Sequence, residues 1–312
     1  MTKTISDKQL LRRHDFCDRI SRIYDISPAE AEQCFSNPRQ QSFWRNPFSE
    51  RVADLSKYQP IDWTAGYGFE GYRLAPDQNL GKLATDGTVM IQNAASWLAV
   101  INLDLMPGNE VYDMCAAPGA KTALIAAISG LNTCIRANDA SSARVAKTKQ
   151  LIKTYNLPNI EVTLSRAEKP PKEIKQYDRI LLDAPCSGDG LVDLSHPEAL
   201  SSWSLTAIER LAQLQRRLLI NAWRQLKPGG TLVYSTCTVA PEENEIQISN
   251  FISKNDDAVL VPVHIDATIE QAKIVPTWRS RRIGRSVIEN TARIKHSGYY
   301  EAFYIAKLIK LA

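Results

Sequence analysis

Long apolar runs are missing from this chain of 312 residues. No stretch reaches the roughly 18 consecutive apolar residues that a transmembrane helix needs. The first ten residues also lack an apolar core, so a secretory signal is not expected. These absences predict a soluble, cytoplasmic protein that has no membrane partner, and we expect it to act as a monomer.

Paired cysteine spacings are missing as well. No two cysteines form a Cys-x-x-Cys pair, so neither a zinc site nor any other metal site is expected. Six thiols in a chain of this size do not make a disulfide scaffold, and a reducing compartment keeps them free. The thiols are Cys17, Cys34, Cys115, Cys134, Cys186 and Cys237.

From residue 109 onward, strand-like segments alternate with helix-like segments, which predicts an α/β fold with a parallel sheet and helices on both faces. A further helix is expected from Pro241, and an edge or antiparallel strand over 299–308. The predicted strands are 109–114, 133–139, 159–164, 177–183 and 230–236. The predicted helices are 119–130, 141–155 and 205–227.

The N-terminal part has a different composition. Apolar spacing over residues 7–36 predicts two amphipathic helices. Residues 37–86 are richer in Trp, Tyr, Pro and Gly, which is typical of short strands and turns. We therefore predict a small α+β domain over 1–85 that helps to position a substrate, followed by a second domain over 86–312.

The turn 116–121 lies between a predicted strand and a predicted helix, where doubly wound sheets bind nucleotide-like ligands. This turn lacks the glycine patterns of dinucleotide enzymes and phosphate loops, which argues against hydride transfer and ATP hydrolysis. Asp139, at the end of the next strand, offers a carboxylate to both hydroxyls of a ribose, and Arg144 is placed to hold it. Alternatively, Asp139 caps the helix that follows.

Cys186 and Cys237 each follow a predicted strand at this edge of the sheet. Cytosine is a poor nucleophile at carbon 5 until a group adds to carbon 6, and a thiolate is well suited to that addition. After methylation, the proton on carbon 5 must leave before the sulfur can depart. One cysteine could attack, and the other could assist release.

Three motifs carry a resemblance to a known family. They are Asp113-Met114-Cys115-Ala116-Ala117-Pro118-Gly119, Asp183-Ala184-Pro185-Cys186-Ser187-Gly188, and Tyr234-Ser235-Thr236-Cys237-Thr238 with its following Glu242-Glu243-Asn244-Glu245. Over about residues 86–308 the chain resembles the S-adenosylmethionine-dependent RNA 5-methylcytosine methyltransferases of the Sun/Fmu type. The resemblance implies a Rossmann-like domain with a mostly parallel seven-stranded sheet, the cofactor S-adenosylmethionine, and a ribosomal or transfer RNA substrate.

By this resemblance, Cys237 attacks carbon 6, Cys186 helps to release the product, and Asp183 protonates or hydrogen-bonds the nitrogen 3 side of the base. Pro185-Cys186 also matches the context of the nucleophile in DNA cytosine methyltransferases, so the reverse assignment of the two cysteines stays open. The residues expected to line the cofactor site are Cys115, Ala116, Ala117, Pro118, Gly119, Ala120, Lys121, Asp139, Arg144 and Asp183.

Two segments depart from the family pattern. Where many relatives place an acid against the adenine, this chain has Arg166, so either Glu168 substitutes or the contact is absent. His196 stands in a segment where relatives often carry Arg/Lys-Asp/Asn-Pro, and it either contacts RNA or caps the loop.

Two other functions compete with RNA cytosine methylation. One is an RNA-binding assembly factor with the same fold and little activity, which Arg166 favours. The other is methylation of an exocyclic amine, against which the position of Cys186 argues. The charge pattern also bears on RNA, because the stretch 273–310 has an excess of Lys and Arg. Such an excess suits phosphate neutralisation, although a solvated basic loop gives the same count.

Overall fold

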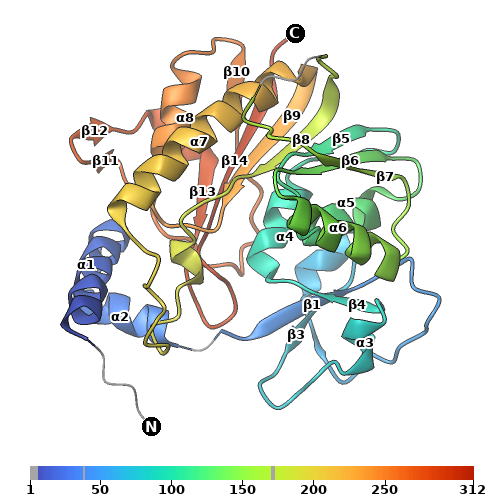
Figure 1. Ribbon diagram of the computed structural model, residues 1–312, viewed down its shortest axis with the longest axis horizontal. Helices are drawn as coiled ribbons and strands as arrows, with labels where there is room; N and C mark the ends of the chain where they lie inside the picture. The colour runs from blue at the N-terminus through green and yellow to red at the C-terminus, as the bar shows by residue number, and fades with distance from the viewer. Residues whose placement is uncertain (1–5, 38, 170–172) are drawn as a thin grey trace.

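A computed structural model describes residues 6–37, 39–169 and 173–312. Its centre is an eight-stranded sheet in the order β10-β14-β9-β8-β5-β6-β7, with β13 also paired to β14 (Figure 1). The predicted mostly parallel sheet is confirmed, since β5 to β9 run parallel and β14 runs antiparallel to β9. Seven strands follow one another in this order, and β13 is an eighth strand that was not predicted from the sequence. The bounds are β5 (Glu110–Asp113), β6 (Cys134–Asp139), β7 (Ile160–Leu164), β8 (Tyr177–Asp183), β9 (Leu226–Thr236), β10 (Ala258–Val261), β13 (Thr291–Ile294) and β14 (Phe303–Lys310).

Helices cover both faces of the sheet, as predicted. Alternate residues of β8 point to opposite faces, so Leu181 packs with the core around α4 and α5, and Ile180 and Leu182 pack with the core around α7 and α8. This alternation gives the sheet two separate apolar layers. The helices are α4 (Ala94–Ile101), α5 (Ala120–Ser129), α6 (Ser142–Thr154), α7 (Leu205–Arg224), α8 (Glu245–Ile252) and the short α9 (Arg285–Asn290).

Two predicted helix boundaries are wrong. The helix expected to reach residue 227 ends at Arg224, because Leu226 already pairs with Tyr177 as the first residue of β9. The helix expected from Pro241 begins at Glu245, since residues 241–244 form a turn. The side chains of this turn bond to the loops after β8 and β9.

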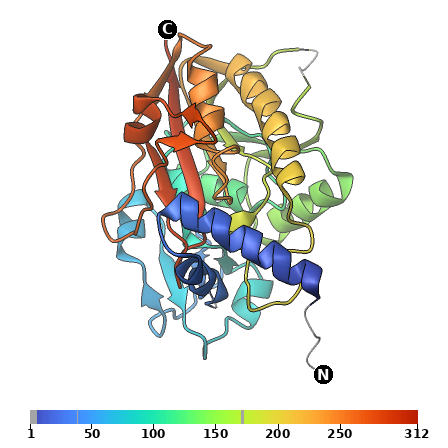
Figure 2. The same ribbon diagram turned by 90° about the vertical axis from the view of Figure 1, so that its left-hand side faces the viewer.

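The N-terminal segment has the two predicted helices, α1 (Asp7–Tyr24) and α2 (Pro28–Ser36), each starting with a serine capping box. Phe16, Ile20 and Phe35 are fully buried in the same apolar core as the α7 side of the large sheet. Figure 2 shows both helices in blue beside the red C-terminal strands. These helices therefore pack against the sheet of the second predicted domain.

A small antiparallel sheet follows in the order β2-β3-β1-β4. Its last strand lies beyond the predicted domain boundary at residue 85, and the division into two domains stays a prediction. The elements are β1 (Gln41–Arg45), β2 (Gln59–Pro60), the 3-10 helix η1 (Asp62–Tyr67), β3 (Gly71–Leu74), α3 (Lys82–Thr85) and β4 (Val89–Ile91). A second 3-10 turn, η2 (Asp189–Leu191), and a hairpin of β11 (Thr277–Trp278) and β12 (Arg281–Arg282) complete the fold.

Within the described ranges, no helix combines the length and the apolar character needed to cross a bilayer.

Candidate active site

The two motif cysteines meet at the carboxyl ends of β8 and β9. These strands are parallel neighbours, and Asp183 pairs in register with Ser235. Cys186 and Cys237 follow the two strand ends, and their Sγ atoms lie 3.3 Å apart. Both side chains are half-buried and both are free thiols. The structure therefore brings the two predicted cysteines into direct contact.

Asp183 is held between two polar partners beside the cysteines. Ser235 Oγ donates to Asp183 Oδ1 at 2.8 Å, and Lys121 Nζ lies 2.9 Å from Oδ2. Burial lowers the pKa of Lys121, but the Asp183 carboxylate more than offsets this, so the net pKa lies above its usual value. The pair therefore places a charged ammonium and a carboxylate at the edge of the site.

The two thiols have different electrostatic surroundings. The hydrogen bond to Cys237 and, next, burial hold the pKa of Cys186 well above its usual value, and the Glu243 carboxylate adds to this. Lys121 lies on the other side, where the negative charge of Cys237 contributes to the raised pKa of the lysine. The surroundings thus favour a protonated Cys186.

The predicted cofactor residues gather at the neighbouring strand ends. Residues 115–119 lie between β5 and α5, Ala120 and Lys121 begin α5, and the N–H of Ala116 donates to the carbonyl of Asn138 at 2.7 Å. Asp139 ends β6, accepts the N–H of Ser141 at 2.9 Å, and lies 3.4 Å from Arg144 Nη1. Arg144 also donates to the carbonyl of Ala117. Arg144 therefore links the acid to the loop, as the sequence suggested.

Asp113 is a buried acid at the end of β5, behind this loop. Thr122 Oγ1 donates to its Oδ2 at 2.6 Å, and its Oδ1 has no hydrogen-bond partner among the described residues. Burial raises the pKa of Asp113 to about 7, and the nearby Asp183 adds to the effect. A half-protonated carboxyl group thus lies beneath the site near neutral pH.

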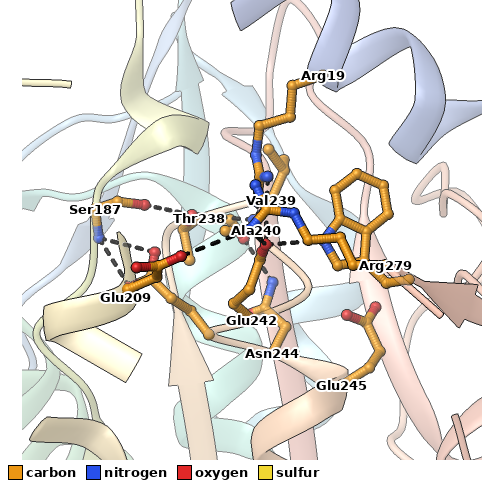
Figure 3. Close-up of polar contacts among 12 residues, drawn as sticks. Arg19, Ser187, Glu209, Thr238, Val239, Ala240, Glu242, Asn244, Glu245 and Arg279 are labelled. Atoms are coloured by element: carbon orange, nitrogen blue, oxygen red, sulfur yellow. Dashed lines mark hydrogen bonds and ion pairs between the residues drawn. The ribbon is translucent and has the colours of Figure 1, made fainter. Parts of the chain in front are cut away.

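Asn244 and the first residue of α8, Glu245, fix the loop that carries Cys237. Asn244 Nδ2 donates to the carbonyl of Thr238 at 2.9 Å, and Glu245 pairs with Arg293, whose Nη1 donates to the carbonyl of Val239 at 2.7 Å. The hydroxyls of Thr238 and Ser187 lie 2.8 Å apart. Figure 3 shows Ser187, Thr238, Asn244 and Glu245 among these groups. The loops after β8 and β9 are therefore joined by polar contacts.

The two departures from the family pattern lie at the periphery. Arg166 Nε bonds to Glu168 Oε1 at 2.6 Å, so the acid proposed as a substitute adenine contact is already engaged by the arginine. The side chain of His196 is 76% exposed and lies 3.5 Å from Asp193. An RNA contact by His196 stays a prediction.

The basic stretch 273–310 is not one continuous charged surface. Arg293 is buried against Glu245, Lys307 pairs with Asp104, and Lys295 pairs with Glu270. The arginines of β12, by contrast, are exposed. Much of the local excess of positive charge is therefore neutralised within the fold.

Sequence reasoning missed three residues of the site. Ser235 bonds to Asp183, Thr122 bonds to Asp113, and Gln215 of α7 donates to the carbonyl of Pro185 at 2.9 Å. Ser235 had a usable signal, because aligning the ends of the two parallel strands places it opposite Asp183. The sequence contains no signal for the role of Gln215 other than its position on the apolar face of a predicted helix.

Within the part of the chain that the structure describes, no group of three or more potential metal ligands occurs. The donors that are present suit S-adenosylmethionine. A carboxylate ends β6 where ribose hydroxyls would lie, and a tight loop precedes the amino end of α5.

Several known proteins are similar to this chain. Residues 100–309 match the family described as 16S rRNA methyltransferase RsmB/F. The tRNA (cytosine(49)-C(5))-methyltransferase of Pyrococcus abyssi is 35% identical over 254 residues, which cover 81% of this chain and 80% of that protein. The ribosomal RNA small subunit methyltransferase B of Vibrio cholerae is 38% identical over 178 residues, which cover 56% of this chain and 40% of the relative.

A solved structure has a similar fold. The crystal structure of a methyltransferase homolog from Pyrococcus horikoshii superposes with a TM-score of 0.73 at 27% identity, and the match covers 95% of this chain and 99% of that one. The family match spans well over half of the chain, and the archaeal relative aligns over most of both proteins. The chain therefore belongs to the RsmB/F family of S-adenosylmethionine-dependent methyltransferases.

Proposed function

We propose that this protein transfers a methyl group from S-adenosylmethionine to carbon 5 of a cytosine in RNA, through a covalent adduct between Cys237 and carbon 6. The observation that carries the proposal is the 3.3 Å contact between the Cys186 and Cys237 sulfurs beside Asp183. Two thiols at the ends of adjacent strands provide one group to attack and another to assist departure.

Cys237 is the proposed nucleophile because an ammonium group attracts it and because the other thiol is held protonated. The Lys121 ammonium attracts negative charge on this sulfur, whereas Cys186 has its pKa raised by its hydrogen bond to Cys237 and by burial. Addition forms the bond between the sulfur and carbon 6, and electron density moves toward nitrogen 3. In this proposal, Asp183, held by Ser235 and Lys121, delivers a proton to nitrogen 3 as the sulfur adds, which neutralises the negative charge that develops there.

Release breaks the bond between carbon 6 and sulfur together with the bond between carbon 5 and hydrogen. In this proposal, the proton of carbon 5 passes to water, the double bond between carbons 5 and 6 forms again, and Cys237 departs as a thiolate. The Cys186 thiol, at 3.3 Å, donates a hydrogen bond to the departing sulfur. Cys186 thereby stabilises the leaving group.

Residues 115–121, Asp139 and Arg144 would hold S-adenosylmethionine, with the Asp139 carboxylate on the ribose hydroxyls. When bound, this cofactor supplies an electrophilic methyl group. The chain's own residues orient it, because Arg144 bonds both to Asp139 and to the carbonyl of Ala117.

The substrate class follows from the relatives, which include a tRNA and an rRNA methyltransferase by name. A target base has to be unstacked to expose carbon 6, which costs a few kcal/mol in a duplex and less in a loop. We infer a single-stranded, bulged or remodelled site in tRNA or rRNA, modified in the cytoplasm by a monomeric enzyme.

A covalent trap tests the proposal. The Cys186→Ala protein, incubated with total cellular RNA and S-adenosylmethionine, should accumulate an RNA adduct on a denaturing gel. The Cys186→Ala/Cys237→Ala protein should form none, and sequencing the trapped RNA would identify the substrate. An adduct that survives the loss of Cys237 would reverse the assigned roles. If the unmodified protein also transfers no methyl group to RNA, the RNA-binding assembly factor becomes the better explanation.

A further inference from the structure

Glu243 is a fully buried acid that bonds directly to the turn bearing Cys186. Its two carboxylate oxygens accept the N–H of Ser187 at 3.0 and 3.3 Å. Gln215 Nε2 donates to Glu243 Oε2 at 2.7 Å and to the carbonyl of Pro185 at 2.9 Å. The residues on either side of Cys186 are thus both fixed by this pair of side chains.

Contacts of the Glu243 backbone and of the neighbouring side chain Glu242 also fix the position of Glu243. Tyr234 of β9 donates its hydroxyl to the Glu243 carbonyl, and the adjacent side chains are engaged elsewhere. Glu242 pairs with Arg19 of α1 and accepts the indole N–H of Trp278, as Figure 3 shows for Arg19. The Glu243 carboxylate therefore has little freedom to move away from Ser187.

The groups that face Glu243 come from three elements. Cys186 and the Asp189 carboxylate lie in the loop after β8, Tyr234 lies on β9, and the uncharged Gln215 lies on α7. Burial raises the pKa of Glu243 to about 7, with Asp189 adding to the effect. The nearby cations are paired with its sequence neighbours, since Arg19 binds Glu242 and Arg293 binds Glu245.

We propose that Glu243 is a positioning residue that holds the Cys186 turn in the geometry required for product release. This inference rests on the proposed function. The carboxylate fixes the Ser187 amide, and its negative charge disfavours a thiolate at Cys186. Cys186 therefore stays a hydrogen-bond donor toward the departing Cys237 sulfur.

The test uses the Glu243→Gln protein with the same RNA and S-adenosylmethionine. Release of the covalent adduct should slow by about 10-fold to 100-fold, as expected for a displaced reacting group, so adduct should accumulate without loss of its formation. The pH at which adduct begins to accumulate should also move downward relative to the unmodified protein. This shift follows because removing the negative charge lets Cys186 lose its proton at lower pH, and a purely structural residue would not cause it.

The matched control is Glu242→Gln, which removes the neighbouring carboxylate that faces α1 and the hairpin instead of Ser187. Its release rate and pH profile should match those of the unmodified protein. If Glu243→Gln does not fold, Gln215→Met removes the second contact to the same turn and should also slow release. Melting temperatures of all variants separate a loss of folding from a loss of release.

Three results would contradict the proposed role of Glu243 or the proposed function. Adduct in the Cys186→Ala protein but wild-type release in both Glu243→Gln and Gln215→Met overturns the role of Glu243 and leaves the proposed function intact. Faster release in Glu243→Gln would mean that a Cys186 thiolate takes the proton of carbon 5, which also overturns it. A lack of adduct even in the Cys186→Ala protein would contradict the proposed function itself.

Discussion

At the scale of single residues, Asp113 is expected to make stability depend on pH. Its pKa is raised to about 7, mainly by burial, so the folded protein holds a proton that the unfolded chain has already released. The stabilising effect is present at low pH and is lost as pH rises toward 7. The difference in unfolding free energy between the unmodified and Asp113→Asn proteins should fall by about 3 kcal/mol from pH 5 to pH 8.

Urea unfolding across this pH range measures the difference. Taking the difference between two proteins cancels other titrating groups, provided that the variant keeps the hydrogen bond from Thr122. A difference that stays constant with pH would show that Asp113 is ionised throughout and that its environment is more polar than its burial indicates.

The positions of the two motif cysteines could be predicted, because each motif lies at the end of a predicted strand. Cys186 and Cys237 were placed at one sheet edge from strand order alone, and their 3.3 Å contact fits that placement, although their roles stay proposals. The contacts of Glu243 and Gln215 were not predictable, because they join segments 28 residues apart through burial that local spacing does not encode.

At the scale of elements, β13 and α8 are held together by one buried ion pair. Arg293 is 1% exposed and Glu245 is 0% exposed, and Arg293 Nη2 lies 2.7 Å from Oε1 and 2.8 Å from Oε2. Arg293→Met would leave a buried carboxylate without its cation, at a cost of about 3–5 kcal/mol in unfolding free energy. Because burial raises the pKa of Glu245, the loss should be smaller at low pH, where the acid is neutral.

Chemical unfolding of Arg293→Met compared with Arg285→Met checks this expectation. Arg285 forms an exposed ion pair with Glu289 four residues along α9, so its replacement should change stability little. Equal unfolding midpoints for the two variants would mean that the buried pair contributes no more than the exposed one.

Element types were predicted better than their boundaries and partners. The five predicted strands between residues 109 and 236 all exist, since they alternate with helical segments in a regular pattern. The short β10 and β13 were missed, because each pairs only with β14, which comes later in the chain. The start of α8 was misplaced, since Glu243 and Asn244 bond to loops instead of opening the helix.

At the scale of the whole molecule, the packing of the N-terminal helices against the sheet could not be predicted from the sequence. Composition separates residues 1–85 from the rest, but Phe16 and Phe35 share a core with Tyr234 of β9. Arg19 of α1 also pairs with Glu242, next to the proposed positioning residue Glu243. A contact of this kind depends on three-dimensional packing between segments more than 200 residues apart in the chain.

We expect the hairpin of β11 and β12, an exposed part of the basic stretch 273–310, to contact RNA, and this expectation concerns the whole molecule. Arg281 and Arg282 of β12 are exposed, and Arg279 of the same hairpin lies 3.5 Å from Glu242. Replacing both exposed arginines with alanine should weaken RNA binding about 5-fold to 20-fold near 0.1 M salt and reduce the salt dependence by roughly 1–2 in log–log slope. Affinity for S-adenosylmethionine should not change.

Fluorescence anisotropy with a labelled RNA over a salt series measures this effect, and the Lys149→Ala/Lys153→Ala protein is the control of equal charge. Both lysines are exposed on α6, which lies far from β12 (Figure 1). If RNA approaches along the hairpin, the Lys149→Ala/Lys153→Ala protein should have an RNA affinity and a salt-dependence slope close to those of the unmodified protein. Equal losses in the two double variants would mean that net charge, and not this surface, attracts the RNA, because a long-range field does not distinguish the two sides.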